Sequence, residues 1–209
     1  MRIEWLGHAS FLIEGARVRV VTDPYEGVGL AFPKVEADAV TVSHEHFDHH
    51  ATDLVGGDFE VVRGPGAKTV AGVEFVGVAT KHDDAGGSLR GDNTVFCFSV
   101  DGVRLVHCGD LGHTLDAETT AAIGPCDVLM VPVGGVYTVE AAGAAAVVEA
   151  LKPKVVLPMH YKIPGLSLEI ADEKPFLAMF SEVERRGSLE LTAGALPGTL
   201  KVVVLERRA

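Results

Sequence analysis

Short runs of apolar and β-branched residues, separated by glycine, proline and aspartate, dominate the chain. Such runs between turn residues are typical of β-strands. Two pairs of runs flank tight-turn sequences, Glu14-Gly15-Ala16 and Asp101-Gly102, and each pair predicts a β-hairpin. The strands expected from this pattern are residues 10–13, 17–22, 39–43, 61–63, 69–70, 73–79, 93–100, 103–108, 127–133, 154–159, 189–191 and 199–205.

Three stretches instead carry helix signals. Residues 116–123 form a short one, and the alanine-rich stretch 139–151 ends just before Pro153. Residues 175–186 begin with a proline, which favours helix entry, and Gly187 follows as a C-cap. Apolar residues at helical spacing in this third stretch predict a buried face formed by Phe176, Leu177, Phe180 and Val183. Because both halves of the chain are rich in strands, the pattern favours two sheets packed face to face with helices outside.

The composition is that of an ordinary globular protein. The length of 209 residues predicts one domain spanning 1–209, and 47% of the residues are hydrophobic. The 29 acidic residues outnumber the 18 basic ones, so the net charge of −11 disfavours binding to nucleic acids or anionic membranes. No apolar run approaches the roughly 20 residues of a membrane span, and the N-terminus has no hydrophobic signal core. Cys97, Cys108 and Cys126 form no Cys-x-x-Cys pair; we expect reduced, buried thiols and a cytoplasmic protein.

The segment His44-Glu45-His46-Phe47-Asp48-His49 is the clearest chemical signal in the chain. On extended backbone, His44 and His46 leave the chain on the same face, and two imidazoles on one face are half of a tetrahedral metal site. Asp48 and His49 follow at the turn and can serve a second metal. The alternative is a solvated polar loop, or helix-capping residues with incidental histidines. We favour the metal interpretation because of the density of ligands.

Further ligands are expected at the carboxyl ends of other strands. His82 follows the strand 73–79, Asp110 follows 103–108, and His160 ends 154–159. Taken singly, each is more often a structural residue than a ligand. Together with the histidine-rich segment after 39–43, they place metal-binding side chains at four strand ends, which can converge on one edge of a sandwich.

With these motifs, the sequence resembles the metallo-β-lactamase-fold hydrolases. It is similar to the branch that contains the L-ascorbate-6-phosphate lactonase and many uncharacterised Zn-dependent hydrolases. The matching pieces occur in the family's order over residues 5–161: Trp5–Ser10, Thr22–Pro24, Ser43–His49, His82, His107–Gly112, Pro132–Gly135 and Pro158–Tyr161. The resemblance implies an α+β fold, an αββα sandwich of two mixed sheets face to face with helices outside.

The resemblance also implies a ligand assignment for two divalent metals. The first metal takes His44, His46 and His82; the second takes Asp48, His49 and His160; Asp110 bridges both, and Asp23 supports the ligand loop without touching metal. The chain departs from the family at His82, which lies in a Lys-His-Asp-Asp context, where much of the superfamily has Pro-Gly-His-Thr. Asp83 and Asp84 are therefore rivals for that position.

Such a ligand set predicts a hydrolase. Two metals can hold a bridging hydroxide that attacks an ester, lactone or phosphoester of a small anionic substrate. Imidazole and carboxylate ligands suit Zn²⁺, and also Mn²⁺, Fe²⁺ or Ni²⁺. A phosphodiesterase or small nuclease is the first alternative. A non-enzymatic metal-binding domain is the second.

Some roles stay open at the level of sequence. His113, three residues after Asp110, is a candidate catalytic proton donor, with a solvent-exposed loop histidine as the alternative. His8 has either a role in the site or a hydrogen-bonded structural role. Lys81, Arg90 and Lys162 lie in or beside the ligand loops and could bind a phosphate or carboxylate.

Overall fold

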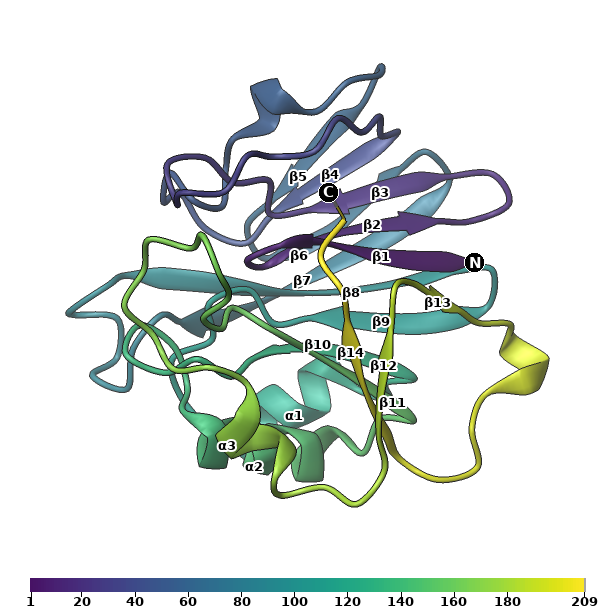
Figure 1. Ribbon diagram of the computed structural model, residues 1–209. Coiled ribbons are helices and arrows are strands. Elements are labelled where there is room, and N and C mark those ends of the chain that lie inside the picture. The colour runs from purple at the N-terminus through teal and green to yellow at the C-terminus, as the bar shows by residue number, and fades with distance from the viewer. Residues whose placement is uncertain (209) are drawn as a thin grey trace.

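Two β-sheets packed face to face form the structure, a computed structural model that describes residues 1–208 (Figure 1). The first sheet contains, in spatial order, β13 (Leu189–Glu190), β1 (Arg2–Gly7), β2 (Ser10–Glu14), β3 (Arg19–Thr22), β4 (Ala39–Val42) and β5 (Glu60–Arg63). The second contains β12 (Val183–Arg186), β14 (Lys201–Leu205), β11 (Val155–Met159), β10 (Val128–Pro132), β9 (Val103–His107), β8 (Asp92–Val100), β7 (Val73–Lys81) and β6 (Gly66–Val70).

Each sheet mixes antiparallel and parallel pairs. In the first sheet, the β1–β2 and β2–β3 pairs are antiparallel, and the β3–β4 and β4–β5 pairs are parallel. In the second sheet, β6 to β9 form an antiparallel meander, and β9, β10, β11, β14 and β12 run parallel. This arrangement confirms the expected α+β sandwich of two mixed sheets.

Both faces of the first sheet are buried, which explains why its strands have so few polar positions. Phe11 and Ile13 belong to the core between the sheets. Leu12 in β2 and Val21 in β3 point to the outer face and pack there against loop residues such as Val35. A strand covered on both sides needs an almost continuous apolar sequence, as parallel and central strands usually show.

The α-helices lie against the second sheet (Figure 1). α1 (Ala117–Ile123) contacts β7, and α2 (Ala141–Leu151) contacts β10 and the short α3 (Lys174–Leu177). α1 and α2 confirm the first two predicted helices. Asp116 caps α1 by accepting a hydrogen bond from the Thr119 N–H at 2.7 Å. Two single-turn 3₁₀ helices occupy Thr52–Leu54 and Ala193–Ala195.

The predicted helix over residues 175–186 is wrong. Only Lys174–Leu177 is helical, and Val183–Arg186 forms β12, which pairs in parallel with β14 from Val183↔Val202 to Arg186↔Leu205. Of the expected apolar face, Phe176 is fully buried but Val183 is 37% exposed. Pairing with β14 outweighs the local helical preference of residues 183–186. Gly187 therefore follows a strand and caps no helix.

The described part of the chain, residues 1–208, holds no helix with the length and apolar character needed to cross a membrane. Cys97, Cys108 and Cys126 are all free and buried. Burial raises the pKa of the Cys108 thiol well above its usual value, so this cysteine is an inert part of the core.

Candidate metal centre

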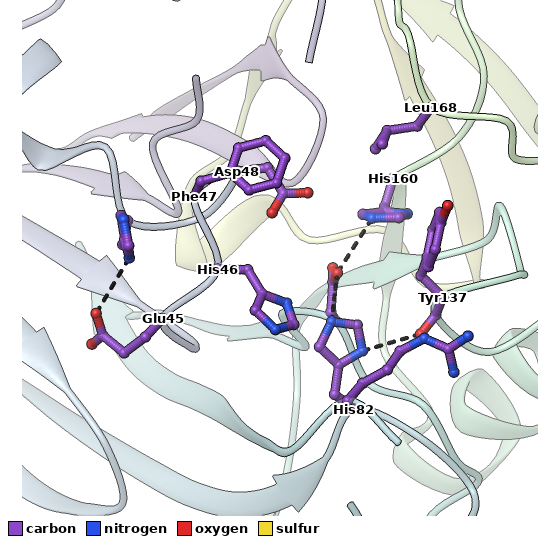
Figure 2. A pocket seen from close by; sticks show the side chains of 11 residues that line it. Glu45, His46, Phe47, Asp48, His82, Tyr137, His160 and Leu168 are labelled. Carbon is purple, nitrogen blue, oxygen red and sulfur yellow. Dashed lines mark hydrogen bonds and ion pairs between the residues drawn. The ribbon is translucent and has the colours of Figure 1, made fainter. Parts of the chain in front are cut away.

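The predicted ligands all lie at one edge of the sandwich, where several strands end. The chain passes from β4 into the segment His44–His49, from β7 to His82, from β9 to Asp110 and from β11 to His160. The structure thus brings together all seven side chains, which contribute to two adjoining clusters around Asp110. Figure 2 shows four of these residues, His46, Asp48, His82 and His160, directed into one pocket.

The first cluster consists of His44, His46 and His82. One ring nitrogen from each of the three lies within 4.8 Å of the others. The rings are fixed from behind: the His44 Nδ1 lies 3.0 Å from the Ser43 hydroxyl, and the His82 Nδ1 lies 3.1 Å from the Tyr137 carbonyl oxygen. A hydrogen bond at Nδ1 sets the tautomer that leaves Nε2 free to bind a metal.

The second cluster consists of His8, Asp48, His49 and His160, again within 4.8 Å of one another. Asp110 lies between the two clusters. Its Oδ2 is 3.2 Å from the Nε2 of His82 in the first cluster, and 3.2 and 3.3 Å from the Nε2 atoms of His49 and His160 in the second. A carboxylate in this position is within reach of both clusters.

The donor set fits divalent metal ions. The buried atoms Asp110 Oδ1 and His44 Nε2 have no hydrogen-bond partner among the described residues. A buried polar atom without a partner costs about 1–3 kcal/mol, which a bound cation would offset. Imidazole nitrogens and carboxylate oxygens are ligands of zinc and its neighbours in the first transition row.

At several positions in the centre, burial and neighbouring charges favour the protonation state that binds metal. Burial, with His49 beside it, lowers the pKa of His44 to about 3, so this imidazole is neutral at pH 7. Burial and the neighbouring His160 likewise lower the pKa of His8 to about 4. Burial alone would raise the pKa of Asp110, but His160 and His49 hold it well below its usual range. The carboxylate between the two clusters is therefore ionised.

Asp23 holds the ligand loop from behind, at a position fully buried from solvent. Its Oδ1 accepts the Ser43 N–H at 2.8 Å, and its Oδ2 accepts from the Ser43 hydroxyl and from His49 Nδ1, the latter at 2.9 Å. Burial alone would lower the pKa of His49, but Asp110 and Asp23 raise it well above its usual value. Asp23 thus links Ser43 and His49 through hydrogen bonds, and its role behind the metal ligands stays a prediction.

We expect Asp23→Asn to weaken binding at the second cluster. An amide offers one acceptor oxygen, whereas both oxygens of Asp23 accept hydrogen bonds, so either Ser43 or His49 loses its acceptor. If His49 then carries its proton on Nε2, that nitrogen has no lone pair for a metal. The expected loss of metal affinity is about 10–100-fold, measured by competition with a chromophoric chelator. Unchanged affinity would show that Asp23 does not orient His49.

Close backbone approaches shape the Asp110 loop. A Cβ on Gly109, whose φ is +55°, would lie 2.4 Å from the Asn93 Oδ1 and 2.5 Å from the Ser43 Cβ. Only glycine therefore fits between these residues. The same Asn93 Oδ1 accepts the Asp110 N–H at 3.0 Å, and this hydrogen bond fixes the start of the loop.

A cavity of about 640 Å³ opens over the two clusters (Figure 2). Besides ligand residues from both clusters, it is lined by Glu45, Phe47, His50, Arg90, Tyr137 and Leu168. Arg90 extends over the Tyr137 ring, with its guanidinium carbon 5.6 Å from the ring centroid. The cavity thus combines an apolar wall, a cation and a floor of metal-binding side chains.

The structure separates His82 from its rivals. His82 Nε2 reaches Asp110, whereas the Asp83 carboxylate accepts four backbone N–H groups, from Ala85, Gly87, Leu89 and Arg90 at 2.7–3.0 Å. Asp84 is exposed and belongs to neither cluster. Asp83 therefore holds the loop after His82 in shape.

His113 lies apart from the cavity lining. Its Nε2 accepts the Lys81 N–H at 3.1 Å, and its Nδ1 donates to the Thr114 carbonyl at 2.9 Å. Both ring nitrogens are thus occupied by backbone groups. We therefore assign no catalytic step to His113.

The sequence left the role of His8 open, and the structure places it in the second cluster. Its Nε2 is 3.1 Å from the Asp48 Oδ2, and its side chain is buried. Local sequence offers one signal, a histidine directly after Gly7 at the end of an apolar run.

Comparisons with known proteins agree with this fold and with dependence on a metal. The profile of the β-lactamase superfamily domain matches residues 2–160. A UPF0173 metal-dependent hydrolase from Archaeoglobus fulgidus is 30% identical over 84% of this chain and 96% of its own length. A second, from Thermococcus kodakarensis, is 34% identical over 77% of this chain and 84% of its own length.

A solved structure covers nearly the whole chain. The protein, a candidate Zn-dependent hydrolase of the metallo-β-lactamase superfamily from Thermotoga maritima, is 43% identical. It superposes with a TM-score of 0.85 over 99% of both chains. The chain therefore belongs to the metallo-β-lactamase superfamily, and within it to the UPF0173 metal-dependent hydrolases. It is a metal-dependent hydrolase with a His/Asp cluster able to bind metal.

Proposed function

We propose that this hydrolase uses two divalent metals, with zinc as the first choice, to cleave an ester, lactone or phosphoester of a small anionic molecule. The observation that carries the proposal is the position of Asp110. Its Oδ2 lies 3.2–3.3 Å from imidazoles of both clusters, and its Oδ1 has no partner among the described residues. One carboxylate between two sets of donors suits a two-metal centre.

The side chains of the centre have separate tasks. When bound, two metals would supply a water of lowered pKa as nucleophile and Lewis acidity toward the attacked group. Asp110 ties the two clusters together, and Ser43 and Asp23 hold His44 and His49 at the orientation seen. No serine or cysteine nucleophile is needed, in keeping with the buried, unreactive Cys108.

The position of Arg90 supports the proposal that the substrate is an anion. Of the three cations named from the sequence, Lys81 pairs with Asp92 and Lys162 with Glu169, and neither lines the cavity. Arg90 lines it and forms no ion pair within residues 1–208. The four hydrogen bonds to Asp83 hold the loop that carries Arg90, so the guanidinium is preorganised to receive a carboxylate or phosphate.

A pair of esters with the same leaving group tests the substrate class. We expect metal-loaded protein to hydrolyse the anionic mono-4-nitrophenyl adipate with a higher kcat/KM than the neutral 4-nitrophenyl acetate. Arg90→Gln removes the cation and is expected to raise KM for the adipate about 10–100-fold, the usual loss for a hydrogen bond to a charged group. The acetate should change little.

Lys81→Gln is the matched control, because Lys81 is a nearby cation whose charge faces Asp92. It should leave both substrates unaffected. Equal effects of Arg90→Gln on both esters would contradict the assignment of Arg90 to anion binding. Turnover of bis(4-nitrophenyl) phosphate without turnover of esters or lactones would favour the phosphodiesterase alternative. Metal-loaded protein that turns over none of these substrates would favour the non-enzymatic alternative.

A further inference from the structure

His8 shares the geometry of an assigned metal ligand. It lies between β1 and β2, is 1% exposed, and directs its Nε2 to 3.1 Å from the Asp48 Oδ2 and 3.2 Å from the His49 Nε2. Donor atoms that share one cation at about 2.0–2.2 Å must lie about 3 Å or slightly more from each other. Both distances from His8 have this spacing, and the third, between Asp48 Oδ2 and His49 Nε2, is 3.8 Å.

His8 and His160 match each other in backbone and in ring environment. Both residues are left-handed, with φ of +53° and +52°, a conformation that costs free energy for a side-chain-bearing residue. The His160 N–H donates to the His8 carbonyl at 3.0 Å, and the two ring centroids are 4.4 Å apart. In both rings the Nδ1 is buried and has no hydrogen-bond partner among residues 1–208, while the Nε2 faces Asp48 or Asp110.

A purely structural histidine in the same molecule differs from His8. His107 is fully buried, and its ring nitrogens contact backbone groups, with Nε2 2.7 Å from the Ala9 carbonyl oxygen and Nδ1 accepting the Gly109 N–H at 3.3 Å. His8 has no such backbone contact at either nitrogen among the described residues. Within residues 1–208, the hydrogen-bond partners of its ring are two side chains of the second cluster, Asp48 and His49.

We propose that His8 is a further ligand of the second metal centre, through Nε2. The proposal rests on the two-metal function above. It makes the two centres unequal: His8, Asp48, His49, His160 and the shared Asp110 surround the second, whereas three histidines and Asp110 surround the first. The second centre would then be held by five protein side chains and the first by four.

Cobalt substitution tests this proposal without a measurement of activity. The metal-free protein is titrated with Co²⁺, and the visible absorption of the bound ions reports their coordination. His8→Gly is the informative variant, because glycine accepts the positive φ of this position and leaves a space the size of an imidazole. His113→Asn, whose ring binds backbone groups only, is the matched control.

We expect wild-type protein to take up two Co²⁺ ions and His8→Gly to bind the second about 10–100-fold more weakly. The absorption of the fully loaded variant should differ from that of the wild type, and added imidazole should restore it. His113→Asn should behave as wild type. Circular dichroism of the metal-free variants shows whether they are folded; if His8→Gly is not, His8→Asn replaces it, since asparagine tolerates the same φ.

Two results would overturn the proposal. An unchanged affinity and spectrum in His8→Gly would show that His8 lies beside the metal without binding it. A weaker affinity with an unchanged spectrum at full loading would make His8 a residue that only positions Asp48. Failure of the proposed function gives a different result: wild-type protein that takes up two Co²⁺ ions, with the His8 effects intact, but hydrolyses no ester, lactone or phosphoester.

Discussion

Asp110→Asn should lower hydrolysis by about 10³-fold or more and leave the protein folded. Asp110 is the carboxylate next to both clusters, and its Oδ2 faces the Nε2 atoms of three histidines. Asparagine keeps the shape but removes the charge, so neither set of imidazoles retains its shared anionic partner. The backbone N–H of residue 110 still donates to Asn93, and the loop is therefore preserved. Steady-state kinetics at saturating metal, with far-UV circular dichroism, measure both effects.

Asp84→Asn is the matched control for this substitution. Asp84 is an exposed acid in the loop next to the centre and belongs to neither cluster. It should retain full activity. An Asp110→Asn protein that binds its metals normally and keeps more than about a tenth of wild-type turnover would exclude a bridging role for Asp110.

His46→Ala should have a comparable effect on turnover with almost none on stability. His46 is exposed, and its ring lies beside the rings of His44 and His82, at centroid distances of 4.6 and 5.0 Å. Its removal opens no core cavity, so the free energy of unfolding of the metal-free protein should change by no more than about 0.5 kcal/mol. The first cluster nevertheless loses one of its three imidazoles, and hydrolysis should fall by about 10³-fold or more.

Urea denaturation of the chelated proteins, followed by kinetics after reloading, separates the two effects. A His46→Ala variant that loses its circular dichroism signal would show that the centre has a structural role. That outcome would favour the non-enzymatic alternative. A catalytic metal on a large sandwich contributes little to the core, in contrast to the metal of a zinc finger.

The ligand segment was predictable because its signal is local. Alternation along a strand predicts that His44 and His46 share one face. In the structure β4 ends at Val42, and both histidines reach the first cluster from the bend that follows it. The carboxyl ends of strands that run in one direction meet at one edge. The convergence of His82, Asp110 and His160 follows from the same rule, once the strands before them are recognised. The contacts that hold these side chains, such as that of the Tyr137 carbonyl with His82, come from loops elsewhere in the chain and have no local sequence signal.

The remaining features depend on contacts between distant residues. Residues 175–186 have a helical spacing of apolar side chains, but the ladder to β14 decides the structure of Val183–Arg186. Strand β1 escaped prediction although Ile3 and Trp5 alternate with polar neighbours, since one short run is a weak signal. The place of His8 depends on a left-handed backbone and on a hydrogen bond from His160, which no pattern of residue types reveals.

The choice among cations shows the same limit. The sequence alone does not distinguish between the three basic residues near the ligand loops, Lys81, Arg90 and Lys162. Only the structure shows that Asp92 and Glu169 pair with the two lysines while Arg90 faces the cavity. The proposed preference for an anionic substrate thus rests on which charge has no ion-pair partner within residues 1–208, and this depends on the folded loop.

The metal content of the isolated protein tests the account most directly. Elemental analysis of protein purified without chelator, normalised to protein concentration by amino-acid analysis, should give close to two divalent ions per chain, as expected for a two-metal centre. His46→Ala and Asp110→Asn should each give less. A wild-type protein with no metal, or with a single tightly bound ion that cannot be raised to about two by added Zn²⁺ or Mn²⁺, would contradict the two-metal centre.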